Sequence, residues 1–88
     1  RAAGKPVVFV DVRQETDHRK ARIPGSFNVP LFAVKARSFW KMKELILVDT
    51  GWGDAKVEME CRRLREQGFA RACILDGGIR AWQRAGKW

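Results

Sequence analysis

The sequence predicts an α/β fold with three layers, in which a central, mainly parallel sheet carries helices on both faces. Short apolar runs typical of strands buried on both faces alternate along the chain with segments of helical period. The length of 88 residues, with 45% hydrophobic and 32% charged content, suits one small domain. We therefore expect a single domain over residues 1–88.

The first third of the chain predicts a strand, a short helix and a turn. "KPVVFVDVR", residues 5–13, is an apolar run that ends in charge, as expected of a central strand. Residues 14–22 are polar and fit one or two helical turns. The next segment predicts a fixed turn and a brief extended stretch, since it contains Pro24, Gly25 and Pro30.

A short helix and a second buried strand are predicted next. The helix covers residues 31–42 and directs Leu31, Val34 and Phe39 inward. The strand is "ELILV", residues 44–48. Its apolar run predicts burial on both faces.

The period then changes to that of an amphipathic helix. Val57, Cys61 and Leu64 follow one another at spacings that place them on one helical face. Asp54 is suited to cap the start of this helix and Gly68 its end.

The last part of the chain predicts a third strand and a final helix. "RACILD", residues 71–76, is the strand, and "GGIRAWQRAG", residues 77–86, is a turn followed by the helix. Ile79 and Trp82 are expected to pack inward.

Charge and cysteine content narrow the possible functions. The net charge of +8 favours encounters with acidic partners, but only residues 18–22, "HRKAR", form a dense basic cluster, and no nucleic-acid-binding module accompanies it. Nucleic-acid binding is therefore not expected, and no apolar run is long enough to span a membrane. Cys61 and Cys73 have no metal-ligand spacing, so we expect two buried, unreactive thiols and neither a metal nor a cofactor.

The triplet Asp-Thr-Gly at residues 49–51 also occurs in the catalytic strand of aspartic proteases. That active site belongs to an all-β fold, and the amphipathic helix that begins near Asp54 argues against it. A hydrolase that uses Asp49 and Asp54 as a carboxylate pair is a further option. A helix cap is the simpler explanation of Asp54, and the sequence offers no general acid beside it.

Four stretches, in order and over almost the whole chain, resemble the rhodanese-like domain family. They are "VFVDVR", "ARIPGSFNVP", "RRLREQGF" and "ILDGGIRAWQRAG". The usual first strand and helix of the family would precede Arg1, so the resemblance implies that the chain is a piece of a longer protein. We expect that protein to be a multidomain bacterial one. The resemblance also implies structural roles for Asp11, Arg13, Arg22, Pro24, Gly25, Gly77, Gly78 and Trp82.

The same resemblance implies where the functional site lies. Active rhodaneses carry a cysteine at the end of the strand that corresponds to "LILV", within a loop whose N–H groups stabilise a thiolate or persulfide. Asp49 stands at that position, so we expect no catalytic residue and a carboxylate set among several N–H donors. The active-site or binding loop comprises Asp49, Thr50, Gly51, Trp52, Gly53, Asp54 and Ala55.

A catalytically inactive binding or regulatory module is the function that follows. The alternative is an active sulfurtransferase of the thiosulfate type that uses Cys61 or a partner's cysteine. The family resemblance implies a protein partner or a fused thioredoxin-like or other redox domain. The sequence leaves open whether Trp52 is a lid or an interface residue, and whether the protein is in the bacterial cytoplasm or the periplasm.

Overall fold

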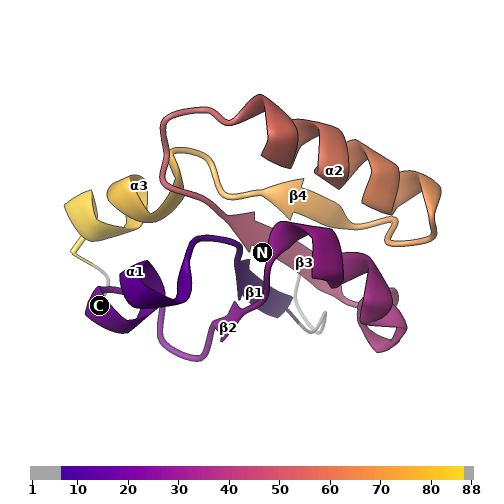
Figure 1. Ribbon diagram of the computed structural model, residues 1–88, viewed down its shortest axis with the longest axis horizontal. Helices are drawn as coiled ribbons and strands as arrows, with labels where there is room; N and C mark the ends of the chain where they lie inside the picture. The colour runs from indigo at the N-terminus through magenta and orange to yellow at the C-terminus, as the bar shows by residue number, and fades with distance from the viewer. Residues whose placement is uncertain (1–6, 87–88) are drawn as a thin grey trace.

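A computed structural model describes residues 7–86 and contains one four-stranded sheet (Figure 1). The strand order is β2-β1-β3-β4, and all three neighbouring pairs are parallel. This confirms the predicted sheet, although Lys5 and Pro6 of the expected first strand lie outside the described residues. The strands are β1 (Val7–Asp11), β2 (Phe27–Asn28), β3 (Glu44–Val48) and β4 (Ala72–Ile74).

Helices lie on both sides of the sheet, as the sequence predicts. One face packs against α2 and the 3₁₀ helix η1, and the other packs against α3 and the segment that follows α1. Side chains alternate between the faces of a strand, so the two central strands, β1 and β3, contribute to two separate cores. The helices are α1 (Glu15–Lys20), η1 (Leu31–Ala36), η2 (Ser38–Trp40), α2 (Ala55–Glu66) and α3 (Gly78–Arg84).

The larger core lies between the sheet and α2. The predicted helix stripe of Val57, Cys61 and Leu64 is buried there. The side chain of Asp54 caps the helix, because its Oδ1 accepts a hydrogen bond of 2.9 Å from the Lys56 N–H. The strands contribute Val8, Val10, Leu45, Leu47 and Ala72 to this core.

The smaller core lies under α3 and contains Ile23, Val48 and Ile79. Trp82 packs against it, with its ring edge-to-face to Phe9 at a centroid distance of 5.9 Å. The inward packing predicted for Ile79 and Trp82 is therefore confirmed.

Phe39 is a point where the structure differs from the prediction. Residues 31–42 form two 3₁₀ helices, η1 and η2, which are interrupted at Arg37. The break at Arg37 changes the direction of the second helix, and Trp40 rather than Phe39 is buried with Val34 in the larger core. The Phe39 side chain is 64% exposed.

Cys73 is likewise not buried, contrary to the prediction. It lies in the short edge strand β4, where Ala72 and Ile74 face the larger core. Alternation turns Cys73 to the other face, and there its side chain is exposed. Both cysteines are free. None of the helices in residues 7–86 has the length and apolar character that a membrane span requires.

Candidate functional site

The site predicted from the sequence lies where β3 ends. In a parallel sheet the carboxyl ends of the strands lie at one edge, and the loops that lead into the helices meet there. β1 leads to α1, β3 to α2 and β4 to α3. The chain segments after Asp11, Val48 and Ile74 are therefore brought to one edge of the sheet.

Asp49 is buried at this edge, with a relative exposure of 7%. Its Oδ1 accepts a hydrogen bond of 3.0 Å from the Gly51 N–H, and its main-chain oxygen accepts one of 3.0 Å from the Ile79 N–H. Within residues 7–86 Gly51 is the single N–H donor to this carboxylate, whereas several donors were expected from the sequence. One of the free N–H groups at the start of α2, that of Lys56, is taken up by the side chain of Asp54 and not by Asp49.

Two glycines hold the loop against the turn between β4 and α3. A Cβ atom on Gly78 would lie 2.5 Å from Asp49 Oδ1 and 2.5 Å from the Gly51 nitrogen. A Cβ atom on Gly51 would collide with the Gly77 carbonyl oxygen. Gly78 therefore has a direct part in the site: its missing side chain leaves the space that the Asp49 carboxylate occupies.

Trp52 lies at the tip of the loop and is 75% exposed. The guanidinium of Arg80 lies over the indole ring, 4.2 Å from its centroid, in a cation–π contact. Trp52 lines neither of the cavities that border Asp49. Trp52 is therefore an exposed surface residue that covers neither cavity in this structure.

An acidic cavity of about 350 Å³ borders Asp49 on one side. Four of its lining residues are carboxylates and none is basic, so the cavity is a region of negative potential in a basic chain. Among the described residues no three potential ligands are grouped so that they could hold a metal ion. The carboxylates are those of Asp49, Asp54, Glu58 and Asp76.

Sequence reasoning missed Glu58 and Asp76 as members of this site. Both could have been found: Asp76 is the last residue of a predicted strand, at the end where site residues of parallel sheets gather, and Glu58 lies one helical turn after Asp54.

A smaller cavity of about 130 Å³ borders Asp49 on the other side. Arg13, Thr50 and Lys56 contribute polar groups to it, and Val12, Leu31 and Val57 contribute apolar ones. This cavity therefore connects the loop with the side of the molecule where α2 and η1 lie.

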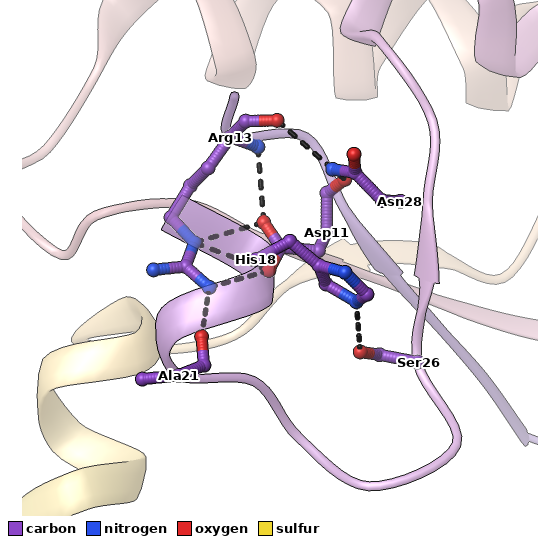
Figure 2. A network of polar contacts seen from close by, with 6 residues as sticks. All are labelled: Asp11, Arg13, His18, Ala21, Ser26 and Asn28. Atoms are coloured by element: carbon purple, nitrogen blue, oxygen red, sulfur yellow. Dashed lines mark hydrogen bonds and ion pairs between the residues drawn. The ribbon is translucent and has the colours of Figure 1, made fainter. Parts of the chain in front are cut away.

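Asp11 and Arg13 form a buried ion pair beside the loop (Figure 2). Arg13 Nε lies 2.9 Å from Asp11 Oδ1, and Arg13 Nη2 lies 2.6 Å from Oδ2, so the guanidinium binds both oxygens. Arg13 Nη2 also donates to the Ala21 carbonyl. The pair thus ties the end of β1 to the end of α1.

The remaining motif residues shape the turn after α1. Pro24 and Gly25 occupy the centre of a turn closed by the Ser26 N–H and the Ile23 carbonyl, and Gly25 has φ +80°. Arg22 is exposed before the turn. Figure 2 shows His18 Nε2 hydrogen-bonded to Ser26 Oγ at 3.1 Å, so His18 braces the turn.

Neither cysteine lies in the loop. Cys61 is buried in α2, and its Sγ receives an N–H of Arg65 at 3.5 Å. Burial raises the pKa of the Cys61 thiol, and desolvation raises the pKa of the Cys73 thiol as well. Both thiols are therefore poorer nucleophiles at neutral pH than an ordinary cysteine.

Fold and site together define a small three-layered α/β domain whose site is a strand-to-helix loop at the carboxyl edge of a parallel sheet. The chain belongs to the Rhodanese-like domain family, which it matches over residues 1–85.

Among its relatives is a protein named "Sulfurtransferase" from Allochromatium vinosum, 30% identical over 80 residues that cover 91% of this chain and 75% of the relative. The "Adenylyltransferase and sulfurtransferase MOCS3-2" of Zea mays is 35% identical over 89 residues, which cover 90% of this chain and only 18% of the relative. The chain thus spans less than a fifth of this plant protein.

Solved structures agree on the fold. The Rhodanese_3-like domain of the Anabaena sp. Alr3790 protein superposes with a TM-score of 0.77 at 24% identity, over 93% of this chain and 95% of that one. The thiosulfate sulfurtransferase from Pseudomonas aeruginosa gives a TM-score of 0.78 at 25% identity, over 94% of this chain and 16% of that one.

Proposed function

We propose that this domain is a catalytically inactive member of the rhodanese-like family that acts as a binding or regulatory module. The observation that carries the proposal is Asp49, which directly follows β3 at the position where the family resemblance implies a cysteine. A carboxylate has no sulfur atom to accept a sulfane sulfur, so the loop cannot form a persulfide.

The electrostatics of the site support this proposal. A thiosulfate anion at the loop would meet the buried Asp49 and the acidic cavity beside it. Like charges at such short range repel, and partial burial weakens the screening by solvent. The side of the loop that faces the acidic cavity therefore disfavours the anions that a sulfurtransferase of the thiosulfate type must bind.

The names of the relatives keep an active sulfurtransferase as the alternative, and Cys61 and Cys73 are the thiols of this chain that would have to serve it. A thiosulfate-to-cyanide sulfur-transfer assay tests this directly. We expect no turnover above the protein-free background. Turnover that disappears in Cys61→Ala or Cys73→Ser would overturn the proposal.

A titration with thiosulfate gives an independent test. We expect no shift of the amide NMR signals of residues 51–54 up to millimolar thiosulfate. Saturable shifts at these residues would mean that the loop still binds anions, and the electrostatic argument would be wrong.

The proposed role requires a partner, either a separate protein or a domain fused to this one. Relatives show that rhodanese-like domains occur within larger proteins, since the chain covers only 18% of the Zea mays relative named above. We extend the proposal to a thioredoxin-like or other redox partner, which the family resemblance implies. Comparing the binding of the reduced and oxidised forms of such a partner would test it.

A further inference from the structure

A shallow apolar groove lies between η1 and α2, on the side of the larger core. Its volume is about 310 Å³, at the low end of the range for ligand-binding clefts. Phe32 from η1 is 69% exposed and Met59 from α2 is 53% exposed, and large apolar side chains that share a cleft are typical of interaction sites. The lining residues are Leu31, Phe32, Lys56, Met59, Glu60 and Arg63.

The groove is continuous with the functional loop. Leu31 and Lys56 line both this groove and the smaller cavity that borders Asp49. η1 and α2 pack directly against each other, so the walls of the groove are fixed relative to the loop. A molecule in the groove would therefore reach the edge of the site.

The polar rim of the groove is basic. Arg63 pairs with Glu60 at 3.7 Å, which offsets the one acidic group in the lining. Lys56 has no ion pair within residues 7–86 and lies at the end of the groove nearest the loop. An occupant with carboxylates beside its apolar side chains would complement this rim.

We propose that this groove binds an acidic amphipathic helix of a partner protein. Its apolar side chains would lie between Phe32 and Met59, as in the helix-in-groove mode of recognition. A carboxylate of the helix would face Lys56, whereas Arg63 is already paired with Glu60. A second copy of this chain fits less well, because two molecules with a net charge of +8 each repel one another. The inference rests on the proposed binding function and names the chemistry of the partner.

The test uses two synthetic helical peptides that share one leucine face. One carries glutamates on its remaining positions and the other carries lysines. Each is titrated into the ¹⁵N-labelled protein. We expect the glutamate peptide to shift the amide signals of Phe32 and Met59 saturably, and the lysine peptide to leave them unchanged.

Matched variants distinguish binding in the groove from non-specific hydrophobic binding. We expect Phe32→Ser to weaken binding of the glutamate peptide at least about tenfold, because the Phe32 side chain would be buried against the peptide in the complex and that contact is lost. Phe39→Ser is the control, since Phe39 is similarly exposed at 64% but lies outside the groove.

The role of charge is tested on α2. Lys56→Glu should weaken binding roughly threefold, the size expected of an exposed ion pair. Arg62→Glu reverses one charge on the same helix but outside the groove, and it should have a smaller effect.

Four outcomes would overturn the proposal: no saturable shift with the glutamate peptide, equal binding of both peptides, equal losses in the Phe32 and Phe39 variants, or groove shifts that depend on protein concentration alone. The last would mean that a second copy occupies the groove. Sulfur transfer is measured separately, so the proposed function and the groove proposal can fail independently.

Discussion

Replacing Gly78 by alanine tests whether the Asp49 carboxylate is packed as closely as the structure shows. Gly78 has φ +57°, and the added Cβ atom would lie 2.5 Å from Asp49 Oδ1, 2.5 Å from the Gly51 nitrogen and 2.6 Å from the Asp49 main-chain oxygen. Left-handed backbone costs a non-glycine residue about 1–2 kcal/mol. Overpacking adds about 1–3 kcal/mol. We expect Gly78→Ala to lower the free energy of unfolding by about 2–5 kcal/mol.

Gly53→Ala is the matched control for backbone strain. Gly53 lies in the same loop with φ +78°, but a Cβ atom there would meet no atom within 4 Å. Only the cost of a left-handed backbone applies at this position, so we expect Gly53→Ala to lower the free energy of unfolding by about 1–2 kcal/mol. Urea unfolding of both variants at pH 7, followed by tryptophan fluorescence, measures the difference.

The double variant Gly78→Ala with Asp49→Ala tests the contact between the added Cβ atom and the Asp49 carboxylate. Removing the carboxylate relieves one of the three close contacts and leaves the two with backbone atoms. We therefore expect partial recovery relative to the sum of the single effects. The close packing of Asp49 against this turn would be refuted by either of two results. One is that Gly78→Ala lowers the free energy of unfolding no more than Gly53→Ala does. The other is that the losses caused by Gly78→Ala and Asp49→Ala simply add in the double variant.

Three further predictions concern the charges and thiols around the site. Arg13→Ala leaves the buried Asp11 carboxylate without its partner, so the free energy of unfolding should fall by about 3–5 kcal/mol in urea titrations; a loss below 1 kcal/mol would contradict the buried-pair argument. A thiol introduced by Asp49→Cys should react slowly with iodoacetamide at pH 7, because the neighbouring carboxylates oppose its ionisation. Adding Asp76→Asn removes one of these carboxylates and should increase the rate of alkylation. An unchanged rate would show that the charge of the acidic cavity does not influence ionisation in the loop. Cys73 is exposed and its pKa is raised, so it should react with iodoacetamide more slowly at pH 7 than free cysteine does, and faster as the pH rises. Reaction at pH 7 as fast as that of free cysteine would contradict the raised pKa.

The local pattern of apolar residues was enough to predict α2, β1 and β3, because the period of a helix or strand is set by residues that are neighbours in the chain. The stripe of Val57, Cys61 and Leu64 predicted α2, and the apolar runs predicted β1 and β3. The same reasoning failed for Phe39, since apolar periodicity does not show whether a short segment adopts α-helical or 3₁₀ geometry. It failed for Cys73 because the exposure of a strand residue depends on which face other elements cover.

By itself, the sequence determined the α/β architecture, the family, and the place of Asp49 in the loop after β3. The tertiary structure decided how that carboxylate is held: by one Gly51 N–H and by the space that Gly78 leaves. It also brought Asp76 to the loop and joined η1 to α2 in a groove. These contacts link residues far apart in the chain, and no local pattern of period or propensity encodes the distance between them.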